Sequence, residues 1–189
     1  SQKEYLAWED VSVSWGPEYL LTVNIAKSLS TLGNIYKPSL ELNIKSAIRD
    51  SGSTTRISNK KRAISGRGDI ILYKNDEPHC VVEVKNGVSS IDKIAHDIDR
   101  ILYIINKEKK LTTWKHGIMA FLMDIDRNEK DSVNIKDELK IKILGLFDEV
   151  KNHKEFSKHI RECHYDIIQE KPYKFEDKQR IWAWSPVCF

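Results

Sequence analysis

Residues 66–87, which read GRGDIILYKNDEPHCVVEVKNG, decide the fold prediction for this chain. Two short apolar runs, 70–73 and 80–84, lie on either side of the polar segment KNDEP. Asn, Asp and Pro between two runs rich in β-branched residues are typical of a turn between two strands. The segment therefore predicts a β-hairpin.

The hairpin is expected to bring three charged side chains together. Side chains alternate across a strand, so Glu83 and Lys85 share one face, while Val82 and Val84 point to the other face and into a core. In an antiparallel pair the start of one strand lies beside the end of the next. Asp69, at the head of the first run, is therefore predicted to lie next to Glu83 and Lys85.

Two carboxylates and one ammonium on rigid strands suit metal-assisted phosphodiester hydrolysis. Mg²⁺ prefers oxygen ligands and keeps several waters, so one or two carboxylates can hold it. The ion neutralises charge on the phosphate and lowers the pKa of a bound water. A neighbouring lysine can orient that water and stabilise the transition state.

Asp69, thirteen residues and then Glu83-Val84-Lys85 resemble the bipartite motif of the PD-(D/E)XK nuclease superfamily, the restriction-endonuclease-like enzymes. The resemblance implies that Asp69 and Glu83 hold Mg²⁺, for which Mn²⁺ can substitute, and that the Val84 carbonyl adds a backbone ligand. It also implies that Lys85 acts on the nucleophilic water. The chain departs from the motif at one position, where Gly68 replaces the proline that names it. The alternative is an ordinary strand whose Glu83 and Lys85 form a surface ion pair of little energetic consequence.

The composition describes one soluble globular domain. The chain has 189 residues, 40% of them apolar and 31% charged, and its formal net charge is +3. Three cysteines without framework spacing, together with no signal-peptide pattern, predict a cytoplasmic protein. No apolar run is long enough to cross a bilayer, so no membrane partner is expected.

Positive charge is concentrated before Asp69. Residues 44–67 contain seven basic residues and one acid, and residues 50–66 form a polar loop rich in Ser and Thr. A basic segment beside a metal site is what a phosphate backbone requires, although a solvated loop would look similar. The residues expected to bind nucleic acid are Arg56, Lys60, Lys61, Arg62 and Arg67.

Helical spacing of apolar residues predicts a helix over 17–32, with Glu18 in its first turn on the inward face. In the resembled family a glutamate of the first helix often joins the metal site, and that role is carried onto Glu18. Residues 39–49 alternate and predict a half-buried strand. Its Glu41 is the rival third carboxylate, although a solvent-facing position suits it better.

A strong amphipathic stripe predicts a helix over 90–108. Lys93, Asp97 and Arg100 on its other side are interpreted as a solvated face with helical ion pairs. The apolar run 117–123 predicts a buried crossover strand. Further along, the sequence predicts helices over 133–152 and 156–167 and an added edge strand over 179–189. The spacing of His153, His159, Cys163 and His164 matches no zinc template.

The predicted fold is α/β, with a restriction-endonuclease-like αβββαβ core and a mixed central sheet flanked by helices. A single domain over 1–189 is expected, with its core at about 16–124 and C-terminal helical and strand additions over 125–189. The predicted function is a Mg²⁺-dependent nuclease acting on DNA, with RNA left open. The alternative is a non-catalytic nucleic-acid-binding or assembly module that keeps this fold. A homodimer or a larger nuclease complex is a candidate assembly, since many enzymes of the resembled fold cut as dimers.

Overall fold

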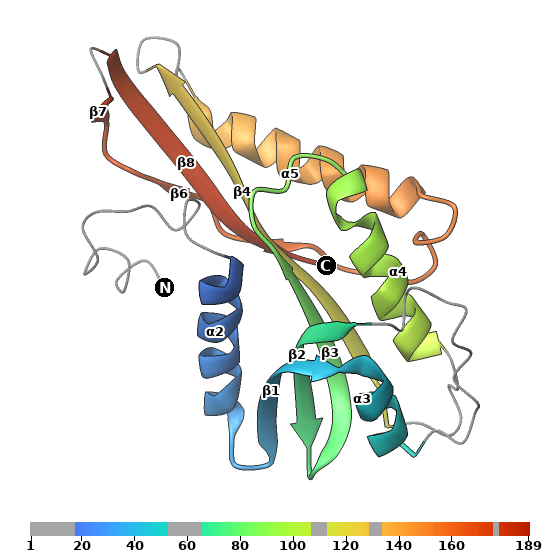
Figure 1. Ribbon diagram of the computed structural model, residues 1–189. Helices are drawn as coiled ribbons and strands as arrows, with labels where there is room; N and C mark the ends of the chain where they lie inside the picture. Colours follow the sequence, from blue (N-terminus) through green and yellow to red (C-terminus); the bar gives the residue numbers. More distant parts are fainter. Residues whose placement is uncertain (1–17, 53–65, 107–112, 129–133, 176–177) are drawn as a thin grey trace. The chain divides into compact units, whose positions relative to one another are not determined.

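The computed structural model describes residues 18–52, 66–106, 113–128, 134–175 and 178–189. This part of the chain is α/β with a mixed, open sheet (Figure 1). The strand order is β1-β2-β3-β4-β8-β5, and β6 and β7 also pair with β8. No helix within the described ranges has the length and apolar character needed to cross a membrane. The mixed sheet and its helices confirm the predicted α/β class, while the specific nuclease core stays a prediction.

The described residues form two compact units. The first holds the residues up to Val84 and from Ile94 to Met119, and the second holds Lys85–Lys93 and Ala120–Phe189. The division into a core over 16–124 and an extension over 125–189 stays a prediction.

The predicted hairpin is confirmed in the first unit. Its strands are β2 (Arg67–Lys74) and β3 (Glu77–Lys85), which are antiparallel with Ile70 opposite Val82. Asn75 and Asp76 form the two-residue turn with φ of 52° and 64°. Positive φ at both turn residues matches the right-handed twist of the strands, and Asn and Asp tolerate it.

The strand predicted over 39–49 is wrong in its second half. Strand β1 (Tyr36–Asn43) pairs with β2, but residues Ile44–Asp50 form helix α3. Asn43 ends the strand and caps the helix, because its side-chain oxygen accepts hydrogen bonds from the backbone N–H groups of Lys45 and Ser46. Ile44, Ala47 and Ile48 are buried at helical spacing, and Ile44 and Ile48 would also share one face of a strand.

The first helix is confirmed as α2 (Glu18–Leu29), followed by the 3₁₀ turn η2 (Ser30–Leu32). Helix α2 packs against β1 and β2. Its buried residues are Thr22 and Ala26, whereas Ile25 and Leu29 are half-buried.

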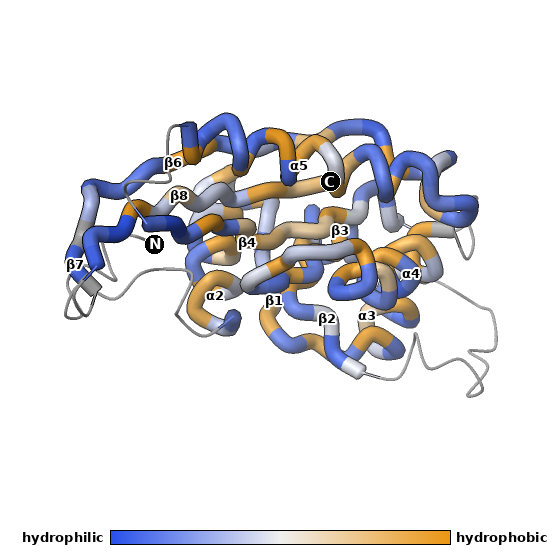
Figure 2. Tube along the Cα trace, turned by 90° about the horizontal axis from the view of Figure 1, so that it is seen from above, coloured by the Kyte–Doolittle hydropathy of each residue, from blue (hydrophilic) through white to orange (hydrophobic). Residues whose placement is uncertain are grey.

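The helix predicted over 90–108 is α4 (Asp92–Asn106). Apolar and polar segments alternate along it in Figure 2, and its buried isoleucines recur at helical spacing. Gly117, at the start of β4 (His116–Asn128), lets this helix approach closely. A Cβ built on Gly117 would lie 2.1 Å from Cγ2 of Ile101, so only glycine fits there without a shift.

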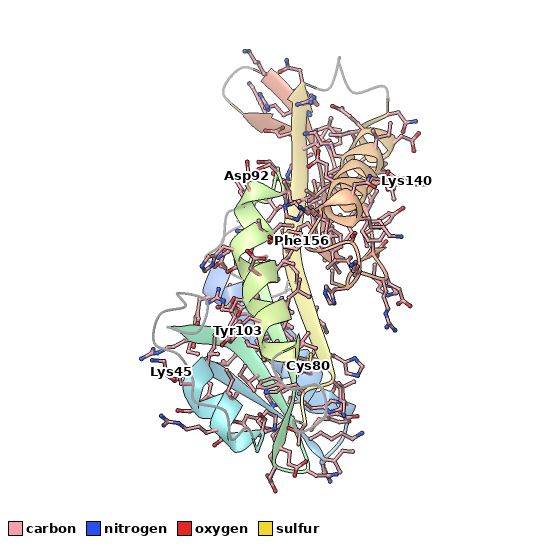
Figure 3. All side chains as sticks on the ribbon, turned by 90° about the vertical axis from the view of Figure 1, so that its right-hand side faces the viewer. Lys45, Cys80, Asp92, Tyr103, Lys140 and Phe156 are labelled. Carbon is pink, nitrogen blue, oxygen red and sulfur yellow. The ribbon has the colours of Figure 1, made fainter. Side chains whose placement is uncertain are left out.

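The second unit contains most of β4, which is longer than the run 117–123 predicted, and the confirmed helix α5 (Ile135–Asn152). Helix α5 packs against β8 (Lys178–Cys188). Lys140, labelled in Figure 3, lies on the exposed side of α5. Phe156, also labelled there, is buried.

Two predictions for this unit are corrected. Strand β8 is not an edge strand, because β4 pairs with it on one side and β5 (His164–Tyr165), β6 (Ile168–Gln169) and β7 (Tyr173–Phe175) pair with it as well. The helix over 156–167 is absent from this described segment, which holds turns and then β5. Pairing of β5 and β6 with β8 satisfies backbone groups that a helix would have satisfied internally.

Candidate active site

Asp69 and Glu83 lie together in the first unit. The register of β2 and β3 sets Ile70 opposite Val82, which brings the preceding Asp69 beside Glu83. Oδ2 of Asp69 accepts a hydrogen bond from the backbone N–H of Val84 at 2.7 Å. The side chains of Asp69 and Glu83 are also hydrogen-bonded to each other. The two carboxyl groups predicted from the hairpin are therefore neighbours.

Glu83 is buried rather than presented to solvent. Only 1% of its surface is exposed, whereas Asp69 is half-buried. Val82 and Val84 are buried too, so this end of β3 is covered on both faces. A buried carboxyl group requires a proton or a positive charge nearby.

Arg100 supplies such a charge. Its Nε lies 3.2 Å from Oε1 of Glu83, and its Nη2 donates a hydrogen bond to Oδ1 of Asp97, which is 4% exposed. Its Nη1 donates to the backbone carbonyl of Arg67 at 3.2 Å. Arg100 thus links α4 to the starting end of β2 and to the final end of β3.

The interpretation of Asp97 and Arg100 as a solvated helix face is therefore wrong. Asp97 follows Ile94 by three residues and precedes Ile101 by four, so it falls inside the apolar stripe of α4. That position was visible in the sequence and would have identified a buried carboxylate. The partner across the sheet, Glu83, could not be identified from periodicity alone.

The cluster of Asp69, Glu83, Asp97 and Arg100 contains more carboxyl groups than cations. The pKa of Glu83 is raised to about 9, first by burial, and then by the neighbouring Asp69 and Asp97, against the lowering effect of Arg100. The hydrogen bond with Asp69 raises this pKa as well, because the protonated Glu83 carboxyl is its donor. In the absence of an added cation, Glu83 is therefore protonated at neutral pH.

Two atoms of the cluster have no hydrogen-bond partner. Although Oε1 of Glu83 and Nε of Arg100 are within ion-pair distance, neither atom makes a hydrogen bond among the described residues, and both are buried. Gly68 borders the same oxygen. A Cβ built on Gly68 would lie 3.8 Å from Oε1 of Glu83 and 3.1 Å from Cδ1 of Ile71. The glycine that replaces the motif's proline is therefore closely packed against Ile71 beside this carboxyl group.

The remaining predicted site residues are less fully placed. Lys85 is the last residue of β3 and half-buried, but it belongs to the second compact unit, so its role on the nucleophile stays a prediction. Glu18 opens α2, half-buried, and its backbone carbonyl accepts a hydrogen bond from the Thr22 hydroxyl. Its role as a further site residue also stays a prediction. Glu41 is exposed in β1 with φ of 52°.

Most of the predicted nucleic-acid-binding residues lie outside the described residues, namely Arg56, Lys60, Lys61 and Arg62. Arg67 is described as the exposed first residue of β2. The backbone carbonyl of Arg67 accepts a hydrogen bond from Arg100. This bond holds the backbone from which the Arg67 side chain extends, two residues before Asp69.

Within the described ranges, no group of three or more His, Cys, Asp or Glu side chains is arranged to hold a metal ion. Asp69 and Glu83 supply two such ligands. The histidines considered for zinc have other contacts, since His153 stacks on Phe156 and His164 lies 3.0 Å from Glu162.

No family model matches the chain, and no curated protein sequence and no solved structure shows significant similarity to it. The geometry of the Asp69–Glu83 cluster is therefore the basis for proposing a function.

Proposed function

We propose that this chain is a metal-dependent nuclease of the PD-(D/E)XK type, which hydrolyses DNA phosphodiester bonds with Mg²⁺ or Mn²⁺. The observation that carries the proposal is the pair of half-buried Asp69 and buried Glu83, whose carboxyl groups come from neighbouring strands and are hydrogen-bonded to each other. Like charges this close cannot both ionise unless a cation joins them.

The residues of the cluster fit a divalent ion on two counts. The donor set consists of carboxylate oxygens, which Mg²⁺ and Mn²⁺ prefer, and two carboxylates suffice when waters complete the shell. Oε1 of Glu83 is buried without a hydrogen-bond partner in the described part of the chain.

Asp69 and Glu83 would hold the ion, with the Val84 carbonyl as a proposed backbone ligand. When bound, the ion would lower the pKa of a coordinated water and neutralise charge on the phosphate. The Val84 N–H fixes the orientation of the Asp69 carboxylate. Lys85 is proposed to orient the attacking water, and Glu18 to support the site from α2. The basic segment before Asp69 is proposed to bind the DNA backbone through its ammonium and guanidinium groups.

One observation favours the alternative, a non-catalytic nucleic-acid-binding or assembly module with a nuclease-like site. The guanidinium of Arg100 already lies 3.2 Å from Glu83 and provides positive charge that a metal ion would otherwise supply. The nuclease proposal leaves RNA open as a substrate in place of DNA. It also includes assembly as a homodimer or a larger nuclease complex, and a cytoplasmic location.

Cleavage of DNA tests the proposal. The protein is incubated with supercoiled plasmid, linear duplex or single-stranded DNA in Mg²⁺, Mn²⁺ or EDTA. We expect metal-dependent cleavage that EDTA abolishes and that Lys85→Ala lowers by about 10²–10³-fold, since a group that stabilises developing charge has an effect of this size. Lys140→Ala, which removes an exposed lysine of α5, is the matched control and is expected to cleave like the unmodified protein.

Salt-sensitive DNA binding without cleavage in any metal would contradict the enzymatic proposal and favour the non-catalytic module. Cleavage that survives in Lys85→Ala would mean that this lysine does not act on the nucleophile.

A further inference from the structure

A pocket lies at the turn end of the β2–β3 hairpin, within the first unit. It is lined by Lys74, Asn75, Glu77, His79, Thr113 and Lys115. By strand alternation Lys74, five residues after Asp69, points to the opposite face of β2. The pocket is therefore separate from the Asp69–Glu83 cluster.

A β-bulge directs His79 into this pocket. Leu72 pairs with Cys80 and Tyr73 pairs with Pro78, so His79 is the extra residue of β3. A bulge interrupts the alternation of a strand and redirects a side chain, and bulges are frequent at functional sites. His79 is half-buried although its neighbours Pro78 and Cys80 are buried.

The other wall of the pocket is fixed to the bulge by hydrogen bonds. The Thr113 hydroxyl donates a hydrogen bond to the backbone carbonyl of Pro78. The backbone N–H of Lys115 donates to the backbone carbonyl of His79 at 2.9 Å. The ring of His116 meets the His79 ring edge to face, with centroids 5.3 Å apart. Basic side chains from two segments distant in sequence are thus held together.

Positive charge is gathered here with little compensation. Lys74 and Lys115 line the pocket and Glu77 is the one acid among the six lining residues. The pKa of His79 is lowered by burial first, and then by His116, Lys74 and Lys115. Nζ of Lys74 lies 5.6 Å from the centroid of the Tyr36 ring. Cations held near one another in this way favour an anion that accepts several hydrogen bonds.

We propose that this pocket binds a phosphate group through Lys74, His79 and Lys115. Lysine binds phosphate as a point charge, and an imidazole N–H adds a donor. The phosphate could belong to a nucleic-acid backbone or to a free phosphate or mononucleotide. The inference goes beyond the proposed nuclease function and needs neither the metal nor catalysis.

An NMR titration in EDTA tests the pocket. The ring signals of His79 and His116 in the full chain are followed while inorganic phosphate replaces chloride at constant ionic strength. We expect a saturable shift of the His79 signal, and an apparent phosphate affinity that Lys115→Ala and Lys74→Ala each weaken about tenfold, the effect of losing one charged hydrogen bond. Lys37→Ala is the control, because it removes an exposed lysine of β1 that pairs with Asp76 outside the lining.

Circular dichroism establishes that each variant is folded, and Lys115→Gln, which keeps most of the side-chain stem, replaces Lys115→Ala if the latter is not. The proposal is overturned if phosphate causes no saturable shift, or if Lys37→Ala weakens binding as much as Lys115→Ala does.

Adding thymidine monophosphate or a 12-nucleotide thymidine oligomer then identifies the source of the phosphate. Displacement of phosphate by the oligomer at lower phosphate-group concentration indicates a backbone, and displacement by the mononucleotide alone indicates a small ligand. If the unmodified protein binds phosphate in this pocket but does not cleave DNA, only the nuclease proposal is contradicted.

Discussion

Glu83→Gln is expected to raise the thermal stability of the metal-free protein at pH 7 and to abolish metal-dependent cleavage. Glutamine has the shape of a protonated glutamic acid, and its amide can donate to Asp69 as the protonated carboxyl does. It cannot ionise and it ligates metal poorly. One substitution is therefore expected to move stability and activity in opposite directions.

The direction of the stability change follows from the pKa of Glu83. That pKa is raised from 4.5 to about 9 by burial, so the folded protein keeps a proton that the unfolded chain releases. This contribution to stability is full below the unfolded pKa and is lost as pH rises through the folded pKa. Between pH 4.5 and 7 the free energy of unfolding falls by on the order of 3 kcal/mol, at about 1.4 kcal/mol per pH unit. Glu83→Gln removes this loss.

Thermal denaturation in EDTA between pH 5 and 8 measures the effect on stability, and the DNA cleavage assay measures the effect on activity. The unmodified protein is expected to lose stability across this range more steeply than Glu83→Gln. Glu77→Gln, at the exposed first residue of the same strand, is the control and is expected to keep the steeper pH dependence. An unchanged pH dependence in Glu83→Gln would contradict the buried, protonated state of Glu83.

Arg100→Ala is expected to lower the free energy of unfolding by about 3–5 kcal/mol, the usual effect of removing one partner of a buried ion pair. The Arg100 side chain is 15% exposed and contacts Glu83, Asp97 and the Arg67 carbonyl. Without the guanidinium, Asp97 loses its closest cationic partner while remaining buried. Chemical denaturation measures the change.

Lys37→Ala is the matched control for this prediction. The pair of Lys37 and Asp76 is also close, at 2.7 Å, but its side chains are 64% and 79% exposed. Solvent screens such a pair, so a change of less than about 1 kcal/mol is expected. Similar effects of the two substitutions would mean that the Arg100 cluster is not buried as described.

The hairpin was predictable because three independent signals agree over residues 66–87. Turn residues, β-branched runs and alternation all favour the same pairing, and the register then brings Asp69 to Glu83. The long helices α2, α4 and α5 were predictable for a similar reason, since their apolar residues recur at helical spacing over several turns.

The errors occurred where local patterns fit two structures. Ile44 and Ile48 suit both a strand and a helix, and the capping bonds of Asn43 decide for the helix. The segment 156–167 has helical spacing, yet pairing with β8 overrides it. Asp97 falls inside the apolar stripe of α4, which already favours a buried position over a solvated ion pair with Arg100. The sequence does not say which element covers that stripe. The partner that buries Asp97 and Arg100, Glu83, is distant in sequence and is known only from the tertiary structure.

Binding of Mn²⁺ tests the central claim, that Asp69 and Glu83 form a divalent metal site. Isothermal titration of the full chain with Mn²⁺, with electron paramagnetic resonance to count bound ions, is carried out on the unmodified protein, Asp69→Asn and Asp92→Asn. Asp92, exposed at the start of α4, is the matched control. We expect a saturable Mn²⁺ site that Asp69→Asn abolishes and Asp92→Asn leaves intact. Equal binding by Asp69→Asn and the unmodified protein, or no binding by either, would contradict the claim.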